Sequence, residues 1–411
     1  MKKAILYVVL ALIVLTSGQG GYTLSGLDVS VAPYRWGLVE WEVGHFFNKW
    51  RYRVRQALPW HLPPAAEETI LQDYFHLNQK IRHMETVVFQ GRIEGYGPEI
   101  ESNMPMETMK EIKKRRANMR PQAEERLEAE ISSILAAEGF QSRIGMIWPP
   151  VDIELVNPPS VLVLSPRDKI ERRGDITLRP GLGIEDLDAL ERRILEEEDL
   201  SALVVSIGGI ATYPSIVSAD HGLSHALQVA AHEWLHQYWW FRPLGRNYSR
   251  DTSTTTLNES AANLAGKELG QLVYSKVTGT SIGRSQKDRN SSDQSDHGFN
   301  FAKEMRETRT EVDALLLDGA VEKAEEYMET KRQVFVDNGY YVRKLNQAYF
   351  AFHGTYASNP ASISPIHLEL SRFRLLQESL GDFITEIAKF GSYEEFRKRL
   401  LSLEQDKSVS G

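Results

Sequence analysis

Residues 232–236 read His-Glu-Trp-Leu-His, so His232 and His236 are separated by about one turn if the segment is helical. Side chains four residues apart lie on the same helix face, which would bring the two imidazoles together. Two imidazole nitrogens in this arrangement can bind one Zn²⁺ ion at about 2.0–2.1 Å. Glu233 follows the first histidine and is placed to take a proton from a water molecule at the metal. The pattern therefore predicts a helix that carries two metal ligands and a general base.

Two helices are predicted around this motif. Residues 222–241 contain no proline and are rich in alanine, leucine and aromatic residues, which is typical of a mostly buried helix that ends before Pro243. A second helix is predicted over residues 251–269, with Asp251 as a candidate N-cap and small residues beside Glu259. An antiparallel return of this helix would bring Glu259 to the histidines. Because a catalytic zinc takes three protein ligands and keeps one open position, we expect one Zn²⁺ per chain, bound by these three side chains.

The motif and the segment after it resemble a known class of metalloprotease. Residues 258–262 read Asn-Glu-Ser-Ala-Ala, which is similar to the Asn-Glu-x-x-Ala motif that follows HExxH in the gluzincins. Residues 299–356 add a looser likeness to the putative zinc aminopeptidases of bacteria, the gluzincin family that the chain resembles most. The resemblance implies a fold in which a sheet precedes the HExxH helix, and an aminopeptidase-like activity on peptide or protein substrates. It also implies that the two histidines and Glu259 bind zinc and that Glu233 is the catalytic base and acid.

The sequence departs from these relatives at two points. Thermolysin-like enzymes have an aspartate four residues after the glutamate ligand, where it orients a zinc histidine, and here this position is Asn263. An amide oxygen can accept the imidazole N–H but has no charge, which predicts a weaker hold on zinc. The glutamates that bind a free α-amine in well-known aminopeptidases have no clear counterpart in this chain. Exopeptidase and endopeptidase activity therefore both stay open.

Two further segments are predicted to lie at the site. Residues 208–214 precede the motif and contain two glycines, which would let a peptide backbone pair as an added strand; the alternative is an ordinary strand end and turn. Residues 340–356 are predicted to form a helix, which the resemblance places near the active site. Tyr356 or His353 would then donate a hydrogen bond to the oxyanion of the reaction. The alternative is a core tyrosine and a surface histidine.

Composition and charge exclude several other classes of function. Hydrophobic residues make up 42% and charged residues 25% of the 411-residue chain, which are ordinary values for a globular protein of two or three packed units. The formal net charge of −8, without a basic stripe, argues against a nucleic-acid partner. The chain contains no cysteine, which excludes disulfides and thiolate zinc ligands.

The first residues predict export from the cytoplasm. The basic start Met1-Lys2-Lys3 precedes an apolar run over residues 4–15 and then a stretch of small and polar residues, which is the shape of a secretory signal. The run is shorter than the about 17–25 residues that span a membrane, although an uncleaved anchor that extends to residue 24 stays open. We therefore expect an extracytoplasmic protein, either secreted or associated with the membrane through its N-terminal segment.

The rest of the chain predicts a mostly helical α+β fold. Helices are expected over residues 35–57, 65–85, 105–138 (broken near Pro121), 184–198, 299–336 in two parts, and 366–402, and strands over residues 87–93, 151–156, 161–164, 176–178 and 203–207. A polar tail is expected over residues 404–411. The chain divides into six regions: 1–24 as signal peptide or anchor, 25–145 as a helical region, 146–218 as a small α+β sheet unit, 219–275 as the zinc-binding helices, 276–298 as a flexible loop, and 299–411 as a helical C-terminal subdomain.

Functions outside the peptidase class stay open at this point. A degenerate peptidase that holds zinc without catalysis would act as a binding module in the cell envelope. A structural envelope protein would instead dock on a partner or a membrane through the aromatic segment at residues 35–57. His221 and His225 are also four residues apart, and we prefer a local role over a second metal pair because no third ligand is evident near them.

Overall fold

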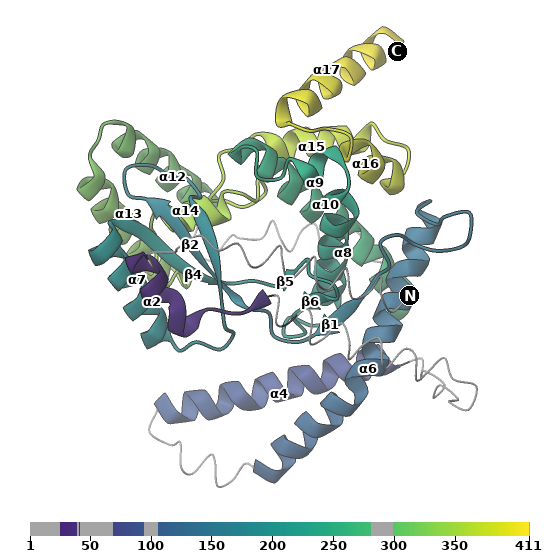
Figure 1. Cartoon of the computed structure of the whole chain (residues 1–411), viewed down its shortest axis with the longest axis horizontal. Helices are drawn as coiled ribbons and strands as arrows, with labels where there is room; N and C mark the ends of the chain where they lie inside the picture. Colours follow the sequence, from purple (N-terminus) through teal and green to yellow (C-terminus); the bar gives the residue numbers. More distant parts are fainter. Residues whose placement is uncertain (1–24, 39–40, 42–68, 94–105, 281–298, 411) are drawn as a thin grey trace, which may run out of the picture.

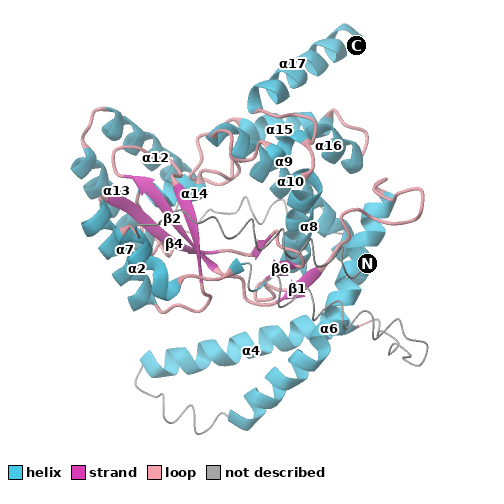
Figure 2. Ribbon diagram, in the orientation of Figure 1, coloured by secondary structure: helices cyan, strands magenta, loops and turns pink. Residues whose placement is uncertain are grey.

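The computed structural model describes residues 25–38, 41, 69–93, 106–280 and 299–410. This part of the chain is α+β and mostly helical, as predicted, but it contains two small three-stranded sheets where the sequence suggested one (Figure 1, Figure 2). Within it, no helix combines the length and the apolar character needed to cross a membrane. The predicted signal or anchor at residues 1–24, most of the aromatic segment 35–57 and residues 281–298 of the predicted loop lie outside the described residues.

Helices on both sides of the sheets make up most of the fold. The N-terminal part contains α2 (Gly26–Val31), a 3₁₀ turn (Ala32–Tyr34), α4 (Ile70–Ile93) and α6 (Met106–Ala137). The C-terminal part contains α12 (Phe301–Leu317), α13 (Val321–Asp337), α15 (Ile366–Leu375), α16 (Leu380–Ile387) and α17 (Tyr393–Ser410). The two helices predicted around Asp318, α12 and α13, are confirmed.

The larger sheet lies between two helices. Its central strand β2 (Ser160–Pro166) pairs antiparallel with β3 (Gly174–Leu178) on one side and with β4 (Leu200–Ser206) on the other. The predicted helix over residues 184–198 is present as α7 (Ile184–Glu198), which packs against one face. The short helix α14 (Gln347–His353) packs against the other face.

Side chains of β2 alternate between two hydrophobic clusters. Leu162 and Leu164 pack with residues of α7, whereas Val161 and Val163 pack with residues of α14. This alternation follows from strand geometry, in which successive side chains point to opposite faces. The α14 side of the sheet is the one that reaches the cavity described below, because Val161 also lines that cavity.

At one edge of the smaller sheet, side chains of helix α6 accept the hydrogen bonds of the strand. Strand β1 (Ile153–Leu155) pairs parallel with β6 (Ser215–Val217), and β5 (Gly209–Ile210) pairs antiparallel with β6 and forms the other edge. Two carboxylates of α6, on Glu124 and Glu128, accept hydrogen bonds from β1 amides at 2.8 and 2.9 Å. Because buried backbone amides need acceptors, these carboxylates take the place of a fourth strand.

Two helices carry the predicted site and lie side by side (Figure 1). The helix α8 (Leu223–Trp240) begins after Gly222, as predicted. The helix α10 (Thr252–Thr278) is capped by Asp251, whose side chain accepts a hydrogen bond at 2.8 Å from an amide of the first turn. The connection between them includes the short helix α9 (Pro243–Arg246). The predicted helix–turn–helix is therefore confirmed, and α10 is longer than the sequence indicated.

The close approach of α8 and α10 depends on two glycines one turn apart on α10. A Cβ atom built on Gly266 would lie 3.0 Å from the backbone nitrogen of His232. A Cβ atom built on Gly270 would lie 2.7 Å from both Cα and the backbone nitrogen of Gln228. A side chain at either position would meet backbone atoms of α8, and these atoms cannot be moved by rotating a side chain. The absence of side chains at these two positions therefore lets α10 pack directly against the histidine helix.

We expect Gly270→Ala to destabilise the protein by about 1–2 kcal/mol. Overpacking of a well-packed core costs about 1–3 kcal/mol, and a clash with backbone atoms belongs in the upper part of that range. Alanine in a helix interior recovers about 1 kcal/mol relative to glycine. Urea unfolding measures the difference, with Gly174→Ala as control because a Cβ atom there meets no atom within 4 Å. An unchanged or higher stability of Gly270→Ala would show that the two helices are not held at this separation.

Three expectations for the helical regions are wrong. Residues 87–93 form the end of α4 rather than a strand, α6 continues through Pro121 without a break, and residues 404–410 continue α17 rather than forming a tail. β-Branched and aromatic residues predicted the strand, but extending an existing helix gains one hydrogen bond per residue. Proline removes only one N–H donor from α6, and Leu127 and Ile131, buried farther along the same helix, hold it against the core.

The predicted helix over residues 340–356 is present only as the shorter α14. Asn346 caps this helix, because its side chain accepts a hydrogen bond at 2.9 Å from an amide of the first turn, and Gly354 follows its last residue. Upstream of the cap, Arg343 pairs with the fully buried carboxylate of Glu191 on α7. This ion pair connects the segment before α14 to the larger sheet, and residues 340–346 are not helical.

Candidate metal centre

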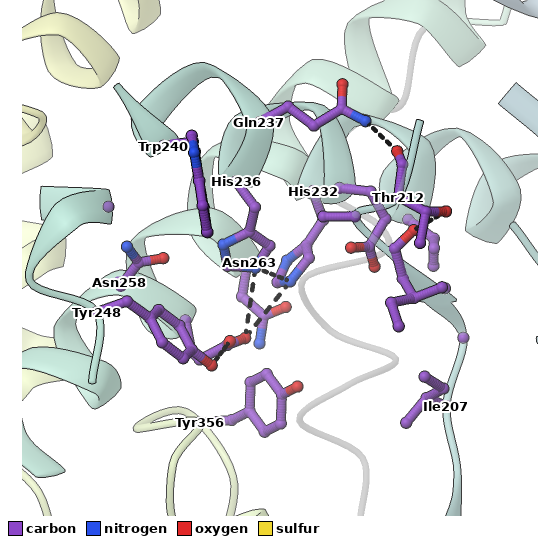
Figure 3. A pocket seen from close by; sticks show the side chains of 18 of the residues that line it. Ile207, Thr212, His232, His236, Gln237, Trp240, Tyr248, Asn258, Asn263 and Tyr356 are labelled. Carbon is purple, nitrogen blue, oxygen red and sulfur yellow. Dashed lines mark hydrogen bonds and ion pairs between the residues drawn. The ribbon is translucent and has the colours of Figure 1, made fainter. Parts of the chain in front are cut away.

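Three predicted ligands meet between α8 and α10. His232 and His236 lie one turn apart on α8, and their Nε2 atoms are 2.9 Å from each other (Figure 3). Glu259 comes from α10, and its Oε2 atom lies 3.5 Å from Nε2 of His232 and 3.6 Å from Nε2 of His236. The three side chains are only 13%, 17% and 8% exposed. The arrangement therefore combines two imidazoles and one carboxylate that are largely buried.

The spacing of these three atoms fits one tetrahedral ion. Ligands at about 2.05 Å from a tetrahedral zinc lie about 3.3 Å from one another. The observed separations of 2.9, 3.5 and 3.6 Å lie on both sides of that value. Within the described part of the chain, this is the one group of three or more such side chains whose ligand atoms all lie within 4.8 Å of one another. The group can therefore hold a metal ion.

Burial and charge oppose each other in this centre. Burial is the largest influence on His236 and lowers its pKa, but the Glu259 carboxylate, with smaller contributions from Glu233 and Asn258, outweighs it and raises this pKa to about 9. For Glu259, burial raises the pKa, and the two imidazoles together lower it well below its usual value. The carboxylate is thus ionised at neutral pH and favours a positive charge beside it. A metal ion that binds here would take the place of a proton.

Tyr248 orients the carboxylate ligand. Its hydroxyl donates a hydrogen bond of 2.5 Å to Oε1 of Glu259, while Oε2 faces the histidines. The tyrosine lies in the connection between α9 and α10, where its backbone oxygen accepts a hydrogen bond of 2.6 Å from the Thr255 hydroxyl. One carboxylate oxygen is therefore held by the protein and the other is presented to the centre. No local sequence pattern marks Tyr248 for this role.

We expect Tyr248→Phe to weaken metal binding by about 10–100-fold. Partners that orient a metal ligand typically contribute this much, and phenylalanine keeps the ring but removes the hydrogen bond to Glu259. Competition with a chromophoric chelator measures the zinc dissociation constant. Tyr274→Phe, the same change on the far part of α10, serves as the control and should leave the constant unchanged. Equal affinities for wild type and Tyr248→Phe would remove this role from Tyr248.

Asn258, rather than Asn263, is the amide beside a histidine ligand. Its Nδ2 atom donates a hydrogen bond of 3.2 Å to the backbone oxygen of Leu244. Its Oδ1 atom is buried without a hydrogen-bond partner in the structure, and the amide lies close enough to His236 to favour the protonated ring. Asn258 can therefore accept the N–H of His236 and leave Nε2 for a metal. Asn263 lines the cavity, and the structure gives its side chain no hydrogen bond to either histidine.

Glu233 is buried at the wall of the same cavity, next to β5. Burial is the main cause of its raised pKa, and the neighbouring histidines act in the opposite direction. A Cβ atom on Gly209 would lie 2.8 Å from Oε1 of Glu233 and 2.6 Å from a methyl group of Val229. The glycine is therefore needed to make room for α8 and its carboxylate. This is a different reason for the glycine than the substrate approach that the sequence suggested.

The structure brings Tyr356 to the centre but not His353. Tyr356 follows the end of α14, lines the cavity and is mostly buried, which together with the Glu259 and Glu233 charges raises its pKa well above the usual value (Figure 3). His353 is not among the cavity-lining residues. Its ring lies 4.3 Å from that of Tyr349 and 5.2 Å from that of Phe352, and burial lowers its pKa to about 4. Of the two predicted donors, Tyr356 alone is placed to act at the centre.

The centre opens into a cavity of about 1870 Å³. The predicted segment around β5 forms part of its wall, together with Trp148 and Arg172. These come from the loop before β1 and from the β2–β3 hairpin, and no local pattern marked them. His225 also lines the cavity, with its ring 4.8 Å from that of His221. Among the described residues, no group of three or more potential ligand side chains includes this pair.

Comparisons with known proteins do not assign the chain. No protein-family model matches the sequence, and neither a curated protein nor a solved structure matches it. The geometry of the site and the motif resemblance are therefore the observations that bear on function.

Proposed function

We propose that this protein is a zinc-dependent peptidase of the gluzincin type. The observation that carries the proposal is the meeting of three ligand side chains with the buried carboxylate of Glu233 at one cavity. The resemblance of HExxH and the following Asn-Glu motif to the gluzincins supports the same reaction class. Two imidazoles and one carboxylate are a ligand set typical of catalytic zinc, which keeps an open position.

The chemistry can be assigned to named side chains. His232, His236 and Glu259 would hold the zinc ion, which when bound polarises a carbonyl group and lowers the pKa of a water molecule. Glu233 would take a proton from the attacking water and pass it to the nitrogen of the leaving amine as the C–N bond breaks. Burial raises the pKa of Glu233, and a pKa nearer neutrality suits a group that must accept and then donate a proton.

Tyr356 is proposed as the hydrogen-bond donor to the oxyanion. Its phenol stays protonated at neutral pH because burial, followed by the nearby Glu259 and Glu233 charges, raises its pKa. A neutral donor held in a buried site stabilises charge that develops during the reaction. His353 receives no role in this proposal, because it lies outside the cavity lining.

We expect Tyr356→Phe to lower kcat by about 10²–10³-fold with little change in KM. This is the typical cost of removing one donor to an oxyanion. Steady-state cleavage of a peptide substrate gives both constants. Tyr349→Phe, on α14 but outside the cavity lining, is the matched control and should stay within about threefold of wild type. A proportional rise in KM with unchanged kcat would assign Tyr356 to substrate binding instead.

Peptides or proteins are the proposed substrates, and nucleic acid is not. The cavity is large enough for several residues, and β5 is an edge strand whose backbone can pair with an extended peptide. Aminopeptidase activity rests on the resemblance. The proposal also places the protein outside the cytoplasm, secreted or anchored, on the strength of its N-terminal sequence.

Cleavage of a mixed peptide library by the purified full-length protein tests this proposal. We expect products that disappear when a chelator removes zinc and return when zinc is added. Stepwise loss of N-terminal residues would identify an aminopeptidase, and internal cuts an endopeptidase. Bound zinc without cleavage of any peptide would contradict the proposal and favour a non-catalytic zinc protein that acts as a binding module.

A further inference from the structure

The acidic groups at the cavity are all engaged. Among the described residues that line it, the carboxylates belong to Asp175, Glu233 and Glu259. Glu259 is a metal ligand and Glu233 the proposed base, and Asp175 is paired with Arg172. A substrate with a free α-amine near the scissile bond would need a carboxylate to receive its charge. No described carboxylate at the cavity is left for that purpose.

Arg172 is held in place with part of its guanidinium group unused. Nε donates a hydrogen bond of 2.9 Å to Oδ1 of Asp175, and Nη2 donates to Oδ2 of the same residue. The guanidinium carbon also lies 5.3 Å from the centre of the Phe352 ring. These contacts fix the guanidinium plane, and Nη1 has no hydrogen-bond partner in the described part of the chain. A fixed guanidinium edge suits recognition of a planar anion.

The position of Arg172 places this donor near the metal centre. It lines the same cavity as the three ligands, and its side chain is only 22% exposed. The Phe352 ring, over which the guanidinium lies, is 5.9 Å from the ring of Tyr356. Arg172 is therefore close to the tyrosine proposed to act at the centre. A peptide bound there would meet a positive charge near its scissile bond.

Three further cations line the cavity, namely Arg246, Arg250 and Lys267. Their side chains are exposed, and none forms an ion pair with a described residue. Exposed cations of this kind do not make a site by themselves. They do give the cavity lining further charge of the same sign as Arg172, which favours the approach of an anionic substrate.

Resting on the proposed peptidase function, we propose that the substrates carry a carboxylate close to the scissile bond and that Arg172 binds it. The carboxylate belongs either to the C-terminus of the peptide or to an aspartate or glutamate side chain. Nη1 of Arg172 donates to it, while Asp175 keeps the guanidinium oriented. Recognition of a free α-amine is not part of this substrate class.

Binding to the zinc-loaded Glu233→Gln protein tests the proposal without requiring turnover. Calorimetric titration compares N-acetylated pentapeptides of three kinds: the alanine free acid, the alanine C-terminal amide, and alanine amides in which one position at a time is glutamate. We expect the free acid or one glutamate amide to bind about 10–100-fold more tightly than the alanine amide, as a hydrogen bond to a charged group typically provides. The free acid identifies C-terminal recognition, and a glutamate amide identifies side-chain recognition.

Adding the Arg172 variants assigns the preference to this residue. Arg172→Gln should abolish the preference for a carboxylate. Arg172→Lys should keep part of this preference, because lysine keeps the positive charge but lacks the planar guanidinium with its paired N–H donors. The control is Arg173→Gln on the same hairpin, which does not line the cavity and should bind like the parent. Thermal melting confirms that each variant is folded.

Two results would overturn the carboxylate proposal. These are equal affinity for all peptides (no measurable binding included) and a preference that persists in Arg172→Gln. Cleavage by the wild-type protein is measured separately. A carboxylate preference without cleavage would therefore refute the peptidase and leave the recognition by Arg172 intact.

Discussion

The Glu233→Gln variant should lose about 10²–10⁴-fold in kcat while it retains one zinc per chain. General acid–base catalysis by a placed side chain typically contributes this much. Glutamine has nearly the same shape as glutamate, but its amide cannot accept the proton of the attacking water. Glu233 lies at the cavity wall and is not one of the three ligands, so the metal should remain. Steady-state kinetics on one cleaved peptide and elemental analysis of the same sample measure both quantities.

A matched substitution separates this effect from a general loss of charge. Glu268→Gln, on α10 but away from the cavity lining, should keep wild-type kcat. Full activity in Glu233→Gln would remove the proposed base from the mechanism. Loss of zinc together with activity would instead mean that Glu233 helps to hold the metal.

The His236→Ala variant should lose both zinc and activity. A direct ligand contributes more to affinity than the residues that orient it, so the zinc dissociation constant should rise by more than about 100-fold. The buried Glu259 carboxylate would also lose one of the two imidazoles that lower its pKa, which adds a stability cost that thermal melting would record. Calorimetric zinc titration of the metal-free protein measures the constant.

His225→Ala is the control for this experiment. His225 is on the same helix and lines the same cavity, but it does not belong to the ligand group. Its removal should leave zinc binding unchanged. One tightly bound zinc in His236→Ala, or loss of zinc in His225→Ala, would refute the assignment of ligands.

Local signals in the sequence predicted the parts of the fold that depend on local physics. The sequence predicted the start of α8, the Asp251 cap of α10 and the span of α7, because caps and hydrophobic periodicity act within a few residues. The return of Glu259 to the histidines was also predicted, from small residues on α10. The structure adds that Gly266 and Gly270 are the ones that allow the contact.

Features that depend on contacts between distant segments were not predictable in the same way. The hydrogen bond from Tyr248 to Glu259 depends on how the chain turns into α10, and the position of Arg172 depends on how the β2–β3 hairpin meets the two helices. The sequence also placed Tyr356 and His353 on one long helix. Because α14 ends at His353, Tyr356 can turn toward the cavity while His353 packs against neighbouring aromatic rings. Helix length decided which of the two candidates reaches the site.

A stoichiometric zinc titration of the metal-free protein, read as peptide cleavage rate, tests the central claim most directly. The proposed centre holds one ion between His232, His236 and Glu259, so the rate should rise linearly and reach its plateau at one zinc per chain. Cleavage that does not depend on zinc would contradict the account. So would zinc binding at one equivalent without any gain in rate, which would identify a metal-binding protein that is not a peptidase.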